Sequence, residues 1–249
     1  MSIEDLKIQR LFIVFALSII TCSTSAQGGM NRPYVDDKLF HFGFQLGMNF
    51  ATFMIHDSEQ QLMMAGAPDT IHSRVSSVMP GFNVGFVSDL RLCKFLNLRF
   101  CPGLQFTSRT ITFKSASGRP VKGSPPLGDR IDVLAIPVNL PLYLKFSAER
   151  MGNFRPYVIG GGGVSFNTSR DREKPIVLNL TDYFCEVGFG VDLYFQWFKF
   201  CPEITYRIGF ANQLAPWSAV GNLTEADGFY SASIKNMTSH CICLTFNFE

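Results

Sequence analysis

The sequence predicts an all-β protein: an eight-stranded antiparallel transmembrane β-barrel with short periplasmic turns and long external loops. Three observations favour this fold class: an apolar composition, a strict alternation of apolar and polar residues, and a regular alternation of short and long connections. The chain has 249 residues, of which 47% are hydrophobic and only 17% are charged, whereas about 25% charged residues is typical of a soluble domain. Since disorder needs low hydrophobicity and high charge, this composition excludes a disordered chain.

The N-terminus carries the one long apolar run of the sequence. Lys7 and Arg10 precede this run over 11–20, and a stretch of small and polar residues then ends at Ala26. The pattern predicts a secretory signal peptide over 1–26, cleaved between Ala26 and Gln27. The run is too short for a membrane-spanning helix, which needs about 20 apolar residues. A short membrane anchor and a lipoprotein acylated at Cys22 are the alternatives.

The rest of the chain divides into a short linker and one barrel. Residues 27–39 are polar and contain Gly and Pro, so we expect a periplasmic linker there, followed by an outer-membrane β-barrel domain over 40–249. In 40–50 every even position is large and apolar and every odd position is polar or Gly, which is typical of a strand with two different faces. Repeats of this alternation predict eight strands, over 40–50, 82–90, 96–109, 134–146, 155–167, 183–195, 198–210 and 241–248.

Alternation alone does not say which face points outward, because a soluble ligand-binding barrel would hide its apolar face in the lumen. The composition of the two faces favours a membrane barrel. The polar face holds Gly, Asn, Gln, Thr and charges of both signs, which suit the crowded lumen of eight strands. The apolar face is rich in Phe, which suits contact with lipid.

The connections follow the pattern of outer-membrane barrels, which have short periplasmic turns and longer external loops. The expected external loops are long and the expected turns are short. The loops cover 51–81, 110–133, 168–182 and 211–235, and the turns cover 91–95, 147–154 and 196–197. We therefore expect a protein of the Gram-negative outer membrane, in contact with its lipid, with the linker and the C-terminus in the periplasm.

Eight charged residues fall on the polar face of the predicted strands. Five are basic and three are acidic: Arg99, Arg109, Lys145, Glu186, Asp192, Lys199, Glu203 and Arg207. Buried charges must be paired to be tolerated. We therefore expect a structural ion-pair network that fills the lumen, with a narrow cation-lined path for anions as the alternative.

Other candidate chemistry is sparse. His56, Asp57 and Ser58 include the residue types of a hydrolase triad, but adjacent residues cannot place nucleophile, base and orienting group in line. Gly160 to Gly163 lack the following Lys-Ser/Thr of a phosphate-binding loop. A net charge of +2 without a basic stretch argues against nucleic-acid binding. We expect no enzyme activity, no cofactor, no small-molecule substrate and no nucleic-acid partner.

Six cysteines follow the predicted signal peptide, and an even number in an exported chain permits disulfides. Their spacing leaves the pairing open, and Cys241-x-Cys243 is not a zinc motif, so we expect no metal site. The six are Cys93, Cys101, Cys185, Cys201, Cys241 and Cys243.

Several segments resemble the PorT-type outer-membrane proteins of Bacteroidetes, within the wider porin-like family of eight-stranded barrels. The segments are DDKLFHFGFQLGMNFATF, LNLRFCPGLQFTSR, IDVLAIPVNLPLYLKF, NFRPYVIGGGG, FKFCPEITYRIGFAN and the terminal FNFE. The resemblance covers nearly all of the mature chain, although Cys101 and Cys201, each before a Pro, depart from the expected pattern. It implies a part in the type IX secretion system, which exports proteinases and gliding adhesins, and partners among its other components.

Three functions follow from these observations. The first is a non-enzymatic barrel component of type IX secretion, which acts through partners because the barrel is too narrow for a folded cargo. The second is a passive structural or small-solute barrel of the outer membrane. The third is a membrane-embedded hydrolase at the loop mouth, which would depend on His56 or His72.

Overall fold

The computed structural model describes residues 30–58, 62–64, 67–116, 128–168, 175–216 and 228–249. The predicted cleavage position between Ala26 and Gln27 lies outside the described residues. Within these ranges, helix is confined to a short 3-10 turn, η1 (Val35–Asp37), and to α2 (Phe229–Ala232). Among the residues described, no helix is both long and apolar enough to cross a membrane.

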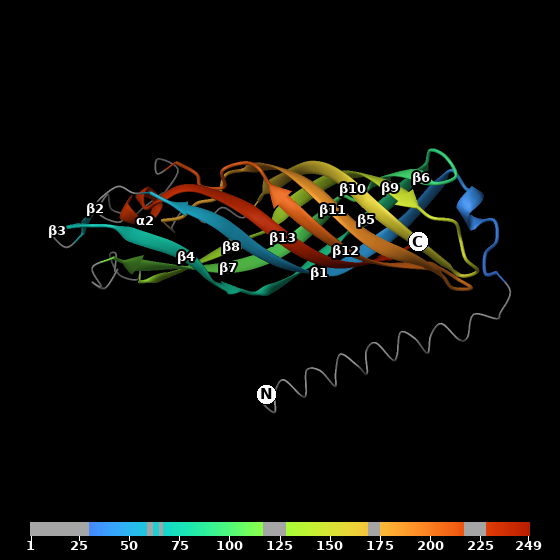
Figure 1. Ribbon diagram of the computed structural model, residues 1–249, viewed down its shortest axis with the longest axis horizontal. Coiled ribbons are helices and arrows are strands. Elements are labelled where there is room, and N and C mark those ends of the chain that lie inside the picture. The colour runs from blue at the N-terminus through green and yellow to red at the C-terminus, as the bar shows by residue number, and fades with distance from the viewer. Residues whose placement is uncertain (1–29, 59–61, 65–66, 117–127, 169–174, 217–227) are drawn as a thin grey trace, which may run out of the picture.

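The strands make eight antiparallel passes along one axis (Figure 1). Five passes are single strands: β1 (Phe40–Asp57), β10 (Phe154–Asn167), β11 (Thr181–Tyr194), β12 (Lys199–Gly209) and β13 (Ile234–Phe248). Three passes are interrupted: β4 (Ile71–Val78) with β5 (Pro80–Arg91), β6 (Leu96–Phe100) with β7 (Gly103–Ser115), and β8 (Arg130–Ala135) with β9 (Pro137–Ser147). A small hairpin of β2 (Leu62–Met64) and β3 (Ala67–Asp69) lies apart from them.

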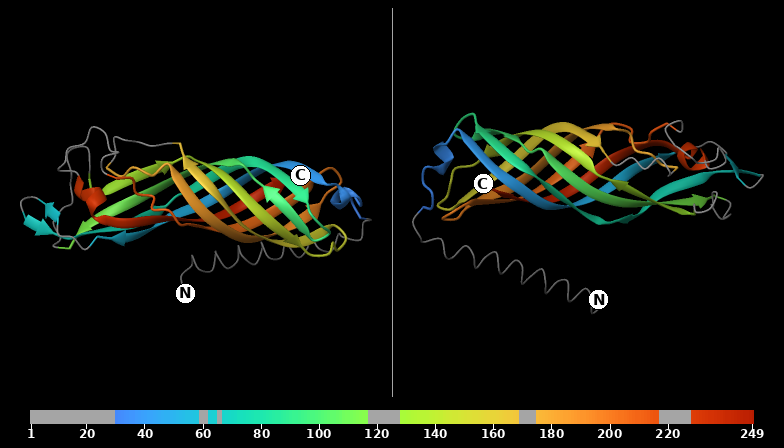
Figure 2. Two further views of the ribbon diagram at one scale, coloured as in Figure 1. Left: turned by 90° about the horizontal axis from the view of Figure 1, so that it is seen from above. Right: turned by 180° about the vertical axis from the view of Figure 1, so that it is seen from behind.

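The sheet closes on itself through its first and last strands. On one side β1 pairs with β13, with Phe44 opposite Phe248. On the other side β1 pairs with β5, from Phe40 opposite Leu90 to Phe50 opposite Pro80. All pairings are antiparallel, and the views in Figure 2 show the resulting barrel from two further sides. The predicted all-β, eight-stranded antiparallel barrel is confirmed.

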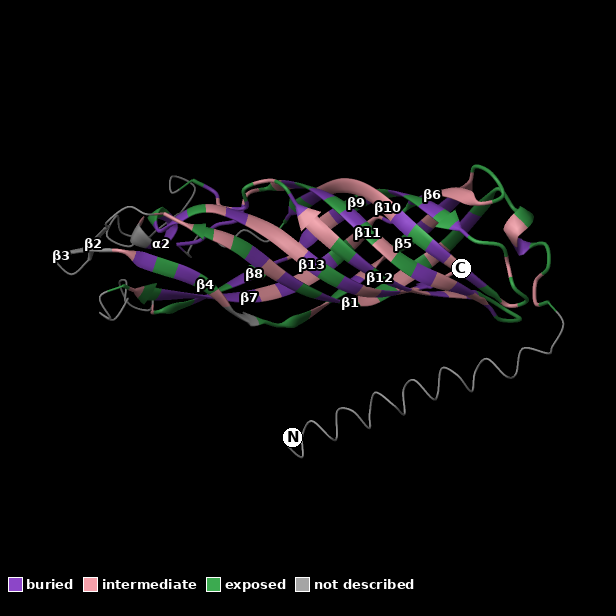
Figure 3. Ribbon diagram, viewed as in Figure 1, coloured by how far each residue is buried: buried purple, intermediate pink, exposed green. Residues whose placement is uncertain are grey.

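Exposure alternates along the strands as the membrane interpretation predicts (Figure 3). On β1 and β5 the phenylalanines of the alternating stretch point outward, and Phe42 and Phe86 are each 72% exposed. The residues at the alternate positions of the same strands point inward, and Asn49 and Asp89 are fully buried. An outer face rich in Phe and a polar interior are the arrangement of a membrane barrel rather than a soluble one.

The connections are short at the end that holds η1 and the C-terminus and long at the end that holds α2 (Figure 1). The predicted long loops are in part wrong, because strands extend into them. β1 continues to Asp57, β4 begins at Ile71, β7 continues to Ser115 and β8 begins at Arg130. These extensions form because their inward side chains, among them Ile71 and Ile111, are buried in a common apolar core.

Glycines allow β9 and β10 to approach closely along 160–163, where four glycines in a row show no alternation of apolar and polar side chains. A Cβ atom on Gly161 would lie 2.1 Å from the carbonyl oxygen of Leu142, and one on Gly163 would lie 2.5 Å from that of Leu140. Such distances exclude any side chain at these two positions. The glycine-rich part of β10 therefore serves its pairing with β9.

Candidate functional site

The lumen is the candidate site, because the inward positions of all eight passes meet there. We divide the barrel interior into five parts, in order from the end with short turns to the end with long connections. They are the mouth segment (residues 30–39), the lower layer, the middle layer, the upper layer and the apolar cap.

The mouth segment holds the predicted linker residues that the structure describes, and it is packed against the barrel rather than extended. The carboxylate of Asp36 lies 3.3 Å from the guanidinium of Arg150 and 3.6 Å from that of Arg155. The hydroxyl of Tyr194 donates to the same carboxylate at 2.7 Å. The Nε2 atom of His41, inside the barrel, lies 2.8 Å from the carbonyl oxygen of Val35. These contacts tie the segment to the short-turn end.

The lower layer is built around Arg99, which is completely buried. Its guanidinium lies 2.9 Å from Asp89, 2.7 Å from Glu249 and 3.4 Å from Glu203. A single cation thus bridges three carboxylates from three different passes, which is how a charge-assisted network fixes strands to one another.

Two lysines complete the lower layer. Lys145 lies 2.8 Å from Asp192, and Lys199 lies 2.5 Å from the second carboxylate oxygen of Glu249. Tyr157 donates its hydroxyl to Glu203 at 2.8 Å, and the Lys145 ammonium lies 4.0 Å from the centre of its ring. The lower layer therefore comprises Asp89, Arg99, Lys145, Tyr157, Asp192, Lys199, Glu203 and Glu249.

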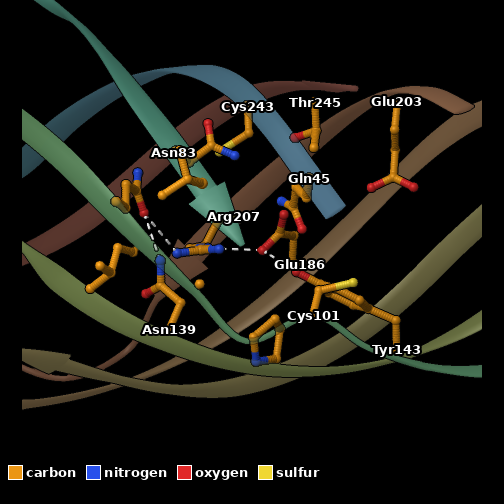
Figure 4. Close-up of a pocket in the computed structure, with 15 residues that line it drawn as sticks. Gln45, Asn83, Cys101, Asn139, Tyr143, Glu186, Glu203, Arg207, Cys243 and Thr245 are labelled. Carbon is orange, nitrogen blue, oxygen red and sulfur yellow. Dashed lines mark hydrogen bonds and ion pairs between the residues drawn. The ribbon is translucent and has the colours of Figure 1, made fainter. Parts of the chain in front are cut away.

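The middle layer is built around the pair of Arg207 and Glu186, whose Nε and Oε2 atoms are 2.8 Å apart (Figure 4). The hydroxyl of Tyr143 donates to Glu186 at 2.9 Å. Arg207 also donates to the side-chain oxygen of Gln105 at 3.1 Å, and Asn139 donates to the same oxygen at 3.0 Å. A cavity of about 30 Å³ lies beside this layer, room for about one water molecule. The layer comprises Gln105, Asn139, Tyr143, Glu186, Thr205 and Arg207.

The upper layer places Arg109 against an aromatic ring. Among the described residues Arg109 forms no ion pair within 4 Å; its guanidinium lies 4.1 Å from the centre of the Phe53 ring and donates to the hydroxyl of Ser239 at 3.2 Å. A second cavity of about 30 Å³ borders Arg109 and Asp182. The structure thus joins seven of the eight predicted network residues in ion pairs and places Arg109 against an aromatic ring. The upper layer comprises Arg109, Asn167, Asp182, Gln213 and Ser239.

The apolar cap closes the lumen at the end with long connections. Its buried members come from five strands, from α2 and from the segment before β11. They are Phe53, Ile71, Ile111, Phe113, Ile131, Val133, Ala135, Ile176, Leu178, Tyr230, Ile234 and Met237. The rings of Phe113 and Tyr230 meet edge to face, with centroids 5.0 Å apart. The described residues thus place a close-packed apolar cluster at this end of the lumen.

Sequence reasoning missed four members of the network. Asp89 lies on the same face of its strand as the predicted inward residues, and Glu249 continues the inward series of β13 by one position beyond the strand end. The same alternation would therefore have found both carboxylates. Tyr143 and Tyr157 were missed because a tyrosine hydroxyl gives no charge signal in a sequence.

The charged residues that face the lumen differ in balance from the five basic and three acidic residues predicted from the sequence. The charged side chains that face the lumen in these layers are five basic and six acidic: Arg99, Arg109, Lys145, Lys199 and Arg207, with Asp89, Asp182, Glu186, Asp192, Glu203 and Glu249. An excess of acidic groups does not make a cation-lined path, so the arrangement favours the structural network over the anion path.

His56, Asp57 and Ser58, the residue types of a hydrolase triad, lie at the C-terminal end of β1. His56 is exposed, and the Asp57 carboxylate contacts β4, where it lies 3.1 Å from Nδ1 of His72 and accepts a hydrogen bond of 2.6 Å from the Ser73 hydroxyl. His72 is exposed whereas Ser73 is buried, since neighbouring residues of a strand point to opposite faces. The carboxylate therefore joins β1 to β4.

All six cysteines are free thiols. Cys93 and Cys185 are exposed and the other four are buried. Cys101 and Cys201, the two that precede prolines, lie in one apolar cluster with Tyr143 and Tyr157. Within the described ranges, no group of three or more His, Cys, Asp or Glu side chains is arranged to hold a metal ion.

Comparison with known proteins gives a family match and two similar structures. The family model for an outer membrane protein beta-barrel domain matches residues 25–214. The crystal structure of Neisserial surface protein A is 10% identical with a TM-score of 0.39, over 84% of this chain and 98% of that chain. The crystal structure of OprG from Pseudomonas aeruginosa is 13% identical with a TM-score of 0.43, over 83% of this chain and 93% of that chain. No curated protein sequence matches the chain.

Proposed function

Because the chain belongs to the family of outer membrane protein beta-barrel domains, we propose that it is a non-enzymatic component of the outer membrane that supports protein export by the type IX secretion system. Its location in the outer membrane follows from the family and the fold. The secretion role rests on two arguments, the filled lumen and the resemblance of particular strands to PorT-type proteins.

The filled lumen is the observation that carries a role through partners. Side chains just fill the interior of an eight-stranded barrel, and here the cavities beside the middle and upper layers measure about 30 Å³ each. The lower layer and the apolar cap occupy opposite ends of the lumen. A folded cargo therefore has no passage, and the protein would contribute to export by contacts with other components rather than by conduction.

The resemblance supplies the identity of the export system. Two of the more specific phrases, DDKLFHFGFQLGMNFATF and LNLRFCPGLQFTSR, form the mouth-proximal part of β1 and the interrupted pass of β6 and β7. The second phrase carries Arg99, Gln105 and Arg109, one side chain in each of the three polar layers. The segments that resemble PorT-type proteins are thus also the segments that fill the lumen.

Gene deletion followed by analysis of the secreted proteins tests the proposal. We expect type IX cargo to remain in the periplasm with its C-terminal sorting domain uncleaved, and the wild-type gene to restore export. A variant with alanine at His56, Asp57 and Ser58 should restore export equally well, because adjacent residues cannot place nucleophile, base and orienting group in line.

Two results would contradict parts of this proposal. Normal cargo export in the deletion strain would refute the secretion role and favour a passive structural barrel. Failure of the triple alanine variant to restore export, with a normal amount of folded barrel in the membrane, would refute the non-enzymatic role and favour a hydrolase at the loop mouth.

A further inference from the structure

Two thiols face each other in the lumen on the last strand. Cys241 and Cys243 are two residues apart on β13, so both point inward, and they are 3% and 5% exposed. Their Sγ atoms lie 3.4 Å apart. Neither takes part in the ion-pair network, and the proposed secretion role makes no use of them.

Polar and basic groups surround the thiol of Cys241. The side-chain nitrogen of Gln105 donates to Sγ of Cys241 at 3.3 Å. Arg207 lies directly opposite Cys241 in the pairing of β12 with β13, and Arg109 borders the same cavity as Cys241. Thiolates are stabilised by hydrogen-bond donors and by nearby guanidinium groups.

Each thiol borders a cavity of the lumen. Cys243 lines the cavity beside the middle layer (Figure 4), and Cys241 lines the cavity beside the upper layer. Both side chains therefore have free volume next to them, and their sulfur atoms can move apart by rotation about χ1 without displacing a strand.

The spacing of the pair suits a bridging ion better than a disulfide. Residues two apart on a strand are separated by roughly 6.6 Å along it, whereas the two Cβ atoms of a disulfide lie only about 3.5–4.5 Å apart. A disulfide would thus pull the strand out of its register with β1 and β12. A metal ion between the two sulfur atoms fills the extra distance and leaves the strand extended.

We propose that Cys241 and Cys243 bind one soft monovalent metal ion, Cu(I) or Ag(I), as a two-coordinate dithiolate. Thiolate ligands select soft ions such as Cu(I), and two ligands are too few for structural zinc, which takes four. Each thiol releases its proton on binding, so the ion and two thiolates carry one net negative charge. The neighbouring Arg207 and Arg109 offset that charge.

The test uses Ag(I) as the probe, because silver needs no reductant and does not change oxidation state here. The full mature barrel, with the exposed Cys93 and Cys185 replaced by serine, is refolded in detergent with Ag(I) in chloride-free buffer. Native mass spectrometry should show one silver ion per barrel. Cys241→Ser and Cys243→Ser should each weaken silver binding by about 100-fold or more. Loss of a residue that only supports a metal ligand weakens binding by about 10–100-fold, and each of these variants removes a ligand itself.

A matched control separates this site from other buried thiols. Cys101→Ser removes a buried thiol from a different cluster and should leave silver binding unchanged. Folding of each variant is checked by its shift on unboiled gels, and X-ray absorption on the silver-loaded barrel should show two sulfur ligands. Silver binding that survives Cys243→Ser in a folded barrel would overturn the proposal. So would a metal-free barrel two mass units lighter than the dithiol, since that species is the disulfide.

Discussion

Arg99 shows how a single side chain can hold several strands of this barrel together. It is completely buried and contacts Asp89, Glu203 and Glu249. These carboxylates reach it from β5, from β12 and from the residue after β13. Its own position on β6 adds a further strand, so the contacts around one guanidinium join distant parts of the ring.

Removal of Arg99 should therefore destabilise the barrel. Arg99→Ala leaves three buried carboxylates without their shared cation, and breaking a buried pair costs about 3–5 kcal/mol. The measurement is the temperature at which the folded form disappears on unboiled gels. Lys94→Ala is the control, because its pair with Glu149 is exposed and exposed pairs contribute about 0–1 kcal/mol. Equal unfolding temperatures for both variants would contradict the network.

Arg109 should respond differently from Arg99 to the same substitution. Arg109 contacts the Phe53 ring and Ser239, and it forms no ion pair within 4 Å among the described residues, so methionine at position 109 keeps the packing volume and breaks no ion pair of that part of the chain. A well-packed apolar replacement of a buried charge is often neutral or stabilising. We expect Arg109→Met to unfold at or above the wild-type temperature and Arg99→Met to unfold below it. The reverse order would mean that Arg109 has an acidic partner in the folded barrel.

At the scale of the strand, β10 depends on glycine at alternate positions. A Cβ atom on Gly161 would lie 2.1 Å from the Leu142 carbonyl oxygen, whereas one on Gly160 would meet nothing nearer than 4.0 Å. Gly161→Ala should therefore cost about 1–3 kcal/mol or more as an overpacked site, and Gly160→Ala should be tolerated. The yield of folded, heat-modifiable barrel checks both, and equal yields would show that β9 and β10 are not held this close.

The outer face of β1 should tolerate no charged residue near the middle of the membrane. Leu46 lies near the middle of the stretch that pairs with β5 and is 46% exposed, so its side chain faces lipid. Leu46→Arg should cost about 2–4 kcal/mol if it sits at the bilayer midplane, and His72→Arg, on an exposed position beyond the membrane, should cost nothing measurable. Unfolding in lipid vesicles by denaturant measures both free energies. A neutral Leu46→Arg would place this face away from lipid.

Much of this architecture could be predicted from the sequence because the period of two residues is a local property. The alternation on β1 alone identifies Asn49 as inward and Phe50 as outward, and the structure agrees. The pairing of Arg99 with Glu203 could not be predicted, since the two residues are 104 positions apart and their contact depends on how the sheet curls. The extension of β4 and β7 was missed because an apolar cap at the end of the lumen has no local signature.

At the scale of the whole molecule, the orientation in the membrane follows from the two unlike ends. Cys93 is exposed in the short connection between β5 and β6, and Lys114 is exposed on β7 at the opposite end. A membrane-impermeant maleimide should label a single cysteine at position 114 on intact cells. It should label Cys93 only after the outer membrane has been opened, because short turns face the periplasm. The opposite labelling pattern would invert the topology.

Ion conductance tests the central claim, a barrel with a filled lumen, most directly. The purified protein is reconstituted into a planar bilayer, with a general porin as the positive control. The lower layer, the middle layer and the apolar cap fill the lumen, and the cavities beside the middle and upper layers measure about 30 Å³ each. We therefore predict no conductance steps above the bare bilayer at any voltage the membrane tolerates. Reproducible, anion-selective steps that scale with the amount of inserted protein would contradict the filled lumen and support a conducting path along Arg109 and Arg207.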